Sequence, residues 1–130
     1  VLSKAQYIEF ALPYMKRIAA AIKEVPVILF AKDAHYIIEE FGNTDCAVIG
    51  LDWTIAPQMA RNEAPGKTLQ GNLDPCVLYA DNATIKKEAE KMLKAFGQQK
   101  YICNLGHGVY PDVDFEIAKY FINTVQDYRF

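Results

Sequence analysis

Four short apolar stretches along the chain have the composition of buried β-strands. Three of them are nearly continuous in apolar or β-branched residues, whereas the third along the chain is more polar. A continuous apolar run is typical of a strand buried on both faces, as in a parallel sheet. The four predicted strands are VPVILFAK (25–32), CAVIGLDW (46–53), KTLQGNL (67–73) and YICNLGH (101–107).

Helical patterns lie between these stretches. Apolar residues at three- and four-residue steps predict an amphipathic helix over 5–23, in which Pro13 marks a start or a kink. The side chains expected on its apolar face are Ile8, Leu12, Met15, Ile18, Ala19 and Ile22. Further helices are predicted over 33–41 (ended by Gly42), 56–62, 82–96 (ended by Gly97) and 111–128.

The predicted order is therefore αβαβαβαβα within a single domain of 130 residues. Repeated β/α units indicate parallel strands with right-handed crossovers. A closed (β/α)₈ barrel needs about 250 residues, so the chain is long enough for at most half of one. The pattern is equally compatible with a free-standing, open four-stranded sheet.

Composition and charge exclude several classes of protein. The formal net charge is −2 and the lysines are scattered, so a nucleic-acid-binding surface is not expected. No apolar run approaches the length of about 18 residues that a membrane span needs. Three cysteines without CxxC spacing favour reduced thiols and a cytoplasmic location.

A polar cluster follows each predicted strand. In α/β folds, ligands bind outside the carboxyl ends of the strands, so four polar strand ends in a row predict one rim of a site. Taken singly, each cluster has a simpler explanation, such as a helix cap at Asp52 or Asp74. The clusters are KD (32–33), DWT (52–54), GNLDP (71–75) and GHG (106–108).

Metal and nucleotide sites are not expected at this rim. Cys103 and His107 lie four residues apart on one strand, which separates them by about 13 Å, too far to share a zinc ion. The glycine spacing of the phosphate-binding motifs is absent from the sequence.

Four motifs, in order and in register, carry a resemblance to a known family. FAKDAH, GLDWT, LQGNLDP and NLGHGVYPD closely resemble the C-terminal portion of the uroporphyrinogen decarboxylase family. The resemblance implies the C-terminal half of a TIM (β/α)₈ barrel and a homodimer. It also implies a carbon–carbon lyase of porphyrin and haem biosynthesis, which converts the four acetate side chains of uroporphyrinogen to the methyl groups of coproporphyrinogen. The family uses no metal and no organic cofactor.

The resemblance assigns one substrate-binding residue, His107, which matches a histidine that contacts a substrate carboxylate. Imidazole can carry a positive charge near neutral pH, which suits a carboxylate ligand. Gly106 and Gly108 are expected to let the backbone turn and the substrate approach. No catalytic residue is assigned, because the family's arginine-rich segment, pyrrole-binding aspartate, tyrosine and serine lie upstream of the matched region.

Other charged residues are expected to be structural. Arg17 and Arg61 are interpreted as helix-surface residues, and Lys32 and His35 as structural or rim-forming.

Three hypotheses follow. The chain, which begins with Val1, is a piece of a uroporphyrinogen decarboxylase and is not competent alone. Alternatively, it is a non-catalytic half-barrel remnant that acts as a dimerising or binding module. A corrinoid-dependent methyltransferase of the same superfamily is disfavoured, because that group has a zinc-binding cysteine where this chain has His107.

Overall fold

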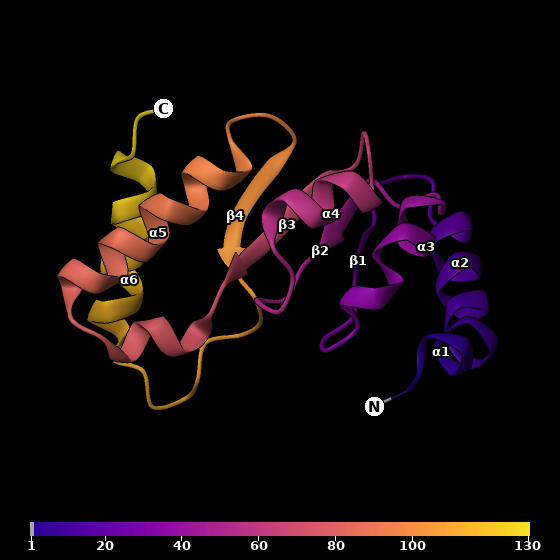
Figure 1. Cartoon of the computed structure of the whole chain (residues 1–130), viewed down its shortest axis with the longest axis horizontal. Helices are drawn as coiled ribbons and strands as arrows, with labels where there is room; N and C mark the ends of the chain where they lie inside the picture. Colours follow the sequence, from indigo (N-terminus) through magenta and orange to yellow (C-terminus); the bar gives the residue numbers. More distant parts are fainter. Residues whose placement is uncertain (1) are drawn as a thin grey trace.

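A parallel four-stranded sheet forms the centre of the computed structural model, which describes residues 2–130 (Figure 1). Each strand pairs with the next one along the chain, in the order β1-β2-β3-β4. The strands are β1 (Ile28–Phe30), β2 (Val48–Gly50), β3 (Thr68–Leu73) and β4 (Tyr101–Leu105). The predicted alternation of helices with parallel strands is confirmed.

Each of the five predicted helical regions contains helix, but the first is divided in two and some ends differ. They are α1 (Lys4–Phe10), α2 (Leu12–Ala21), α3 (Ile38–Gly42), α4 (Pro57–Glu63), α5 (Asn82–Phe96) and α6 (Phe115–Asp127), with short 3₁₀ segments at η1 (His35–Ile37) and η2 (Pro75–Tyr79). Figure 1 shows α1 and α2 at one end of the molecule and α5 and α6 side by side at the other.

Two helix boundaries differ from the predictions for local reasons. The helix predicted over 5–23 is two helices that meet at Ala11, because Pro13 lacks an N–H and is tolerated only in the first turn of α2. Helix α6 begins at Phe115 instead of 111, because the carboxylate of Asp114 accepts a hydrogen bond from the Glu116 N–H and caps the helix there.

The two faces of the sheet have different surroundings. Leu29, Ile49 and Leu69 point toward the helices and are fully buried. On the opposite face Ile28, Phe30 and Ile102 are 46%, 43% and 40% exposed. The prediction that these strands are buried on both faces is therefore wrong for β1 and β4, because the helices of residues 2–130 cover only one face.

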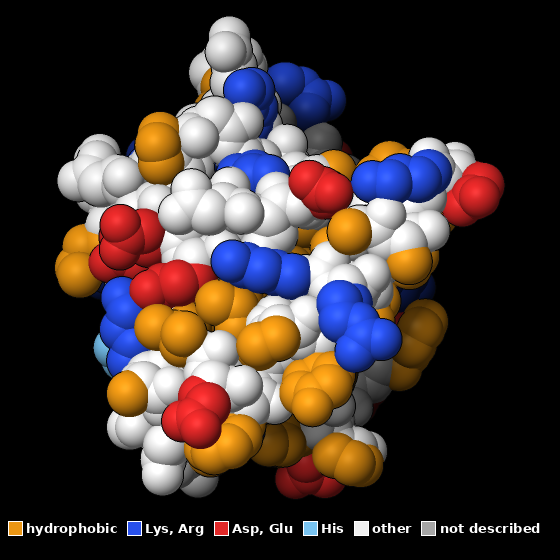
Figure 2. All heavy atoms as spheres, turned by 90° about the vertical axis from the view of Figure 1, so that its right-hand side faces the viewer, with side chains coloured by type: hydrophobic (Ala, Val, Ile, Leu, Met, Phe, Trp, Pro, Cys, Tyr) orange, Lys and Arg blue, Asp and Glu red, His pale blue; other side chains and the backbone are white. Residues whose placement is uncertain are grey.

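A second apolar surface lies on α2. Leu12 and Ala19 are buried as predicted, but Ile18 and Ile22 are exposed, as is Ile8 on α1. At 3.6 residues per turn Ile18 lies about 120° around the helix from Leu12, outside the narrow stripe that contacts the core. Figure 2, which views this end of the molecule, shows apolar side chains gathered on the surface among lysine and arginine side chains.

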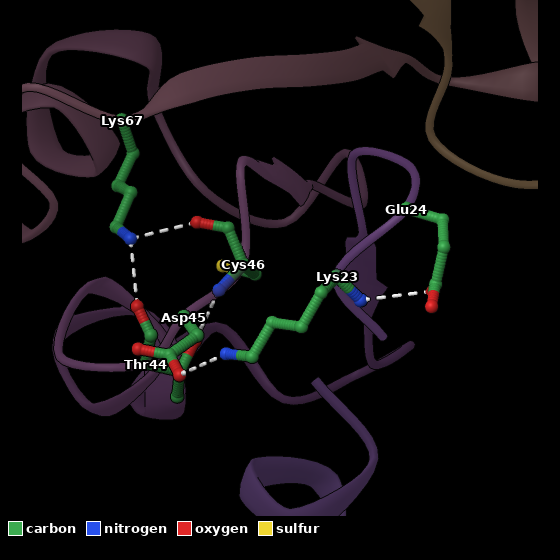
Figure 3. A network of polar contacts seen from close by, with 6 residues as sticks. All are labelled: Lys23, Glu24, Thr44, Asp45, Cys46 and Lys67. Atoms are coloured by element: carbon green, nitrogen blue, oxygen red, sulfur yellow. Dashed lines mark hydrogen bonds and ion pairs between the residues drawn. The ribbon is translucent and has the colours of Figure 1, made fainter. Parts of the chain in front are cut away.

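Polar contacts join the segments that lead into the strands. The Lys67 ammonium donates to the carbonyl oxygens of Thr44 (2.8 Å) and Cys46 (2.7 Å), which ties the start of β3 to the start of β2 (Figure 3). The Arg61 guanidinium donates to the carbonyl oxygen of Gln99 at 2.9 Å, just before β4. Arg61 lies on α4 and is partly exposed, in agreement with its interpretation as a helix-surface residue, but it also links two segments, which was not predicted.

Candidate functional site

His107 lies at the opposite end of the strands, two residues after β4. It lines a cavity of about 310 Å³ at the carboxyl edge of the sheet. The lining includes residues of β1, β2, β3 and β4, so the structure brings the predicted site residue together with residues from each strand. The other lining residues are Phe30, Gly50, Leu51, Gln70, Asn104, Leu105, Gly106, Gly108 and Val109.

The two ring nitrogens of His107 have different surroundings. Nδ1 lies 2.7 Å from the carbonyl oxygen of Gly108. Because a carbonyl oxygen only accepts hydrogen bonds, Nδ1 must carry a proton. Nε2 is shielded from solvent and has no hydrogen-bond partner among the described residues. A buried polar atom without a partner costs free energy, so Nε2 is the atom of this side chain that is suited to a ligand.

Two aromatic side chains contact the imidazole ring. The ring centroid of His107 lies 4.8 Å from that of Trp53 and 5.1 Å from that of Tyr110, with interplanar angles of 75° and 89°. The predicted rim includes Trp53 within the cluster DWT (52–54) but not Tyr110, and neither residue was given a role. The available signal was that Trp53, the only tryptophan of the chain, directly follows an apolar strand and an aspartate.

The glycine before His107 is required by a close contact. A Cβ atom at Gly106 would lie 2.6 Å from the backbone nitrogen and 3.0 Å from Cε3 of Trp53. A Cβ atom at Gly108 would meet no atom within 4 Å. Gly106 therefore permits a close approach between two backbone segments of the chain, at Gly106 and Trp53, and the predicted approach of a substrate stays a prediction.

We expect Gly106→Ala to lower the free energy of unfolding of the chain by about 2 kcal/mol, because the added methyl group overpacks against backbone that cannot move aside. The measurement is urea denaturation. Gly42→Ala is the matched control, since its Cβ would make ordinary contacts at 3.4–3.5 Å. Equal effects of the two substitutions would contradict the steric explanation.

Asp52 is a buried carboxylate that organises the ends of β1 and β2. It is 3% exposed. Oδ2 accepts a hydrogen bond from the Asp33 N–H at 2.6 Å, and Oδ1 accepts from the N–H and the hydroxyl of Thr54 at 2.9 and 2.5 Å. Asp33 has φ of 57°, so this bond also holds a backbone conformation that non-glycine residues rarely adopt. Asp52 is thus an anchor for two turns and not a helix cap.

Asn72 extends the same network to β3. It is 8% exposed, and its side-chain amide donates to the carbonyl oxygens of Asp52 and Ile55, both at 2.8 Å. Asp74, two residues later, accepts from the Cys76 N–H at 2.9 Å and caps η2, which agrees with the helix-cap interpretation of that residue. The polar residues that follow β2 and β3 therefore hold the scaffold of the site.

Lys32 and His35 lie on the exposed rim. The Lys32 ammonium is 5.6 Å from the centroid of the Trp53 ring, and His35 Nδ1 is 3.2 Å from the Thr54 hydroxyl. Both contacts are with residues that follow β2, which supports the interpretation of these side chains as structural or rim-forming.

The cavity has little charge of its own. Among the lining residues that the structure describes, His107 is the only one that can carry a positive charge, and none is Arg, Lys, Asp or Glu. No cluster of three or more His, Cys, Asp or Glu side chains within residues 2–130 is arranged to hold a metal ion. In the same range, no helix is long and apolar enough to cross a membrane.

Comparison with known proteins gives one consistent family. The model of the uroporphyrinogen decarboxylase (URO-D) family matches residues 1–128. The chain is 51% identical over 128 residues to uroporphyrinogen decarboxylase of Ovis aries, a match that covers 90% of this chain and 35% of the sheep protein. The enzyme of Chlorobaculum parvum is 45% identical over 135 residues, covering 97% of this chain and 38% of that protein. The chain spans about a third of the length of these relatives.

A solved structure with the same fold is a methyltransferase from Methanosarcina mazei. It superimposes with a TM-score of 0.83 at 14% sequence identity, over 98% of this chain and 38% of the methyltransferase chain. At this identity the likeness concerns the fold alone.

Proposed function

Because this chain belongs to the uroporphyrinogen decarboxylase family, we propose that it forms the carboxyl-terminal part of an enzyme that removes CO₂ from the four acetate side chains of uroporphyrinogen. The product is coproporphyrinogen, within cytoplasmic haem biosynthesis. The observation that carries the proposal is the family match over residues 1–128, within which His107 lines the cavity at the carboxyl edge of the sheet.

In this proposal the four strands are half of a (β/α)₈ barrel, and the rest of the enzyme supplies the other strands. Two features support it. The edges of β1 and β4 carry no partner strand within residues 2–130. The face away from the helices exposes Ile28, Phe30 and Ile102, as expected of a surface that lines the interior of a closed barrel.

The proposed role of His107 is to hold a substrate carboxylate. With Nδ1–H directed to the Gly108 carbonyl oxygen, a second proton on Nε2 makes the ring a cation whose Nε2–H can donate to the carboxylate. Such a hydrogen bond between charged groups is among the strong ones. A carboxylate there would also give the buried Nε2 atom the partner that it lacks within the chain.

The reaction itself requires neither a metal nor an organic cofactor. Protonation of a pyrrole carbon makes the ring a cation. When the bond between the acetate CH₂ and its carboxylate breaks, the electron pair flows into that ring, CO₂ departs and the CH₂ is left as an exocyclic methylene group. Protonation of this CH₂ gives the methyl group, and loss of the proton that was added to the ring carbon restores the pyrrole. The group that protonates the ring and the group that binds the pyrrole N–H atoms are assigned to the rest of the enzyme, which we expect to be a homodimer.

A chimaera tests the proposal directly. The matching 128 residues of the sheep enzyme are replaced by this chain, and the formation of coproporphyrinogen from uroporphyrinogen is measured. We expect turnover. A chimaera that folds and dimerises like the sheep enzyme but forms no product would contradict the proposal.

In the active chimaera, we expect His107→Asn to lower kcat/KM by about 10- to 100-fold. This is the rate equivalent of losing a hydrogen bond between charged groups, worth about 1.5–3 kcal/mol. His35→Asn, the same substitution at the only other histidine of the chain, is the control and should change kcat/KM less than about twofold. An unchanged rate for His107→Asn would remove His107 from the site and leave the family function intact.

The alternative candidate is a non-catalytic half barrel that associates with other copies or binds a partner. One observation favours it: the cavity offers a polyanionic substrate only one group that can be positively charged. The folded but inactive chimaera described above is the outcome that would support it.

A further inference from the structure

We propose that Trp53 and Tyr110 are positioning residues, which hold the His107 imidazole in one orientation at the wall of the cavity, where it binds the substrate carboxylate. This inference rests on the proposed function. It assigns a role to two side chains that are not themselves expected to bond to the substrate.

The need for a clamp arises from the position of His107. It lies in the segment between β4 and α6, where residues 106–114 form no helix or strand and the neighbouring Gly108 and Val109 are exposed. Among the described residues its side chain makes a single hydrogen bond, to the carbonyl oxygen of the adjacent residue. Side chains on irregular loops hold a binding geometry poorly unless packing locks their rotamer.

The two aromatic rings supply that packing. Both lie nearly perpendicular to the imidazole, at centroid distances of 4.8 Å for Trp53 and 5.1 Å for Tyr110. Such edge-to-face pairs are favourable by about 0.5–1.5 kcal/mol beyond the burial of area. Contacts with two rings restrict where the imidazole lies, and the bond from Nδ1 to Gly108 determines which nitrogen points away from the loop backbone.

Trp53 is itself contacted by residues that follow two other strands, β4 and β1. Gly106 allows the backbone after β4 to pass so close to Trp53 that no side chain would fit between them. The Lys32 ammonium, which follows β1, lies 5.6 Å from the indole centroid, within the range of a cation–π interaction. The indole is therefore fixed relative to the sheet and not only to the loop.

Tyr110 is supported from the segment that follows β3. Its ring lies 6.0 Å from that of Tyr79. The Tyr79 hydroxyl donates to the carboxylate of Asp112 at 2.6 Å, and this bond raises the pKa of Tyr79 to about 12. The loop that carries His107 is thus tied to η2 on one side and to β2 on the other.

The first test is the NMR spectrum of the 130-residue chain, which contains only two histidines. Ring currents of Trp53 and Tyr110 should displace the Cε1–H resonance of His107, which is assigned by its loss in His107→Asn. We expect Trp53→Leu and Tyr110→Leu each to move this resonance toward its unshielded position. Phe115→Leu, at the most exposed large apolar side chain, is the control and should not move it.

The second test is a double-mutant cycle in the chimaera. We expect Trp53→Leu to raise KM about tenfold with kcat changed less than about twofold, because the proposed role of His107 is to bind the substrate and not to take part in the chemical step. Trp53→Phe retains an aromatic edge and should stay within about threefold of the unsubstituted KM. In the His107→Asn background, Trp53→Leu should change KM less than about twofold.

Two results would overturn the inference. One is a His107 resonance that stays in place in both leucine variants, provided the dispersion of the methyl resonances shows that they fold. The other is an equal rise in KM from Trp53→Leu in the presence of His107 and in the His107→Asn background. This result would mean that the tryptophan acts on the scaffold instead of the imidazole. If the unsubstituted chimaera is inactive, the proposed function fails, and the NMR result alone then decides whether the clamp exists.

Discussion

The purified 130-residue chain is expected to form no detectable coproporphyrinogen from uroporphyrinogen, whereas the chimaera with the remainder of the sheep enzyme forms it. The physical reason is the charge of the cavity, whose lining offers one imidazole and no Arg or Lys among the described residues. Arg61 cannot compensate, because its guanidinium is bonded to backbone carbonyl oxygens at the other end of the strands. Binding a polyanion without compensating positive charge is unfavourable.

The measurement is separation of the oxidised porphyrin products after incubation of each protein at equal concentration. The chimaera in the same assay is the positive control. Product from the short chain at a rate above that of buffer alone would contradict the prediction, and would mean that this chain, about a third of the length of its relatives, supplies more of the chemistry than its charges indicate.

Asp52→Ala is expected to lower the free energy of unfolding by about 3 kcal/mol. The substitution removes the buried carboxylate that accepts hydrogen bonds from the Asp33 N–H, the Thr54 N–H and the Thr54 hydroxyl, and a hydrogen bond to a charged group contributes about 1.5–3 kcal/mol. It also releases the positive φ of Asp33. The fluorescence of Trp53, the next residue and the only tryptophan, reports unfolding in urea directly.

The matched control is Asp45→Ala. Asp45 pairs with Lys23 at 3.3 Å, but the two side chains are 62% and 67% exposed, and such ion pairs contribute little. Its unfolding midpoint should therefore remain close to that of the unsubstituted chain when both are measured at the same protein concentration. If Asp52→Ala shifted the unfolding midpoint as little as Asp45→Ala does, the buried network would not be what holds the strand ends together.

Features that depend on local sequence could be predicted. The helix over 82–96 has the predicted bounds, because the Asp81 carboxylate caps its first turn through the Thr84 N–H and Gly97 ends it with a positive φ. The order of parallel strands followed from the alternation of apolar runs with amphipathic segments. The position of His107 at a strand end followed from the apolar run YICNL before it.

Features that depend on contacts between distant segments could not be predicted. The exposure of Ile28 and Phe30 depends on whether other segments cover that face of the sheet. The apolar sequence of a strand does not indicate whether its second face is covered or open. The role of Arg61 depends on carbonyl groups more than thirty residues away along the chain. The contact between Trp53 and His107 exists only because two loops meet at the sheet edge.

The order β1-β2-β3-β4 has a consequence for how the protein is made. Paired residues such as Ile28 and Val48, or Val48 and Thr68, lie about 20 residues apart, and Leu69 and Tyr101 about 30. Contact order is correspondingly modest for a parallel sheet, which favours rapid formation. As the chain leaves the ribosome, each strand can add to the one synthesised just before it, so no place in the sheet has to be kept open for a strand that emerges later.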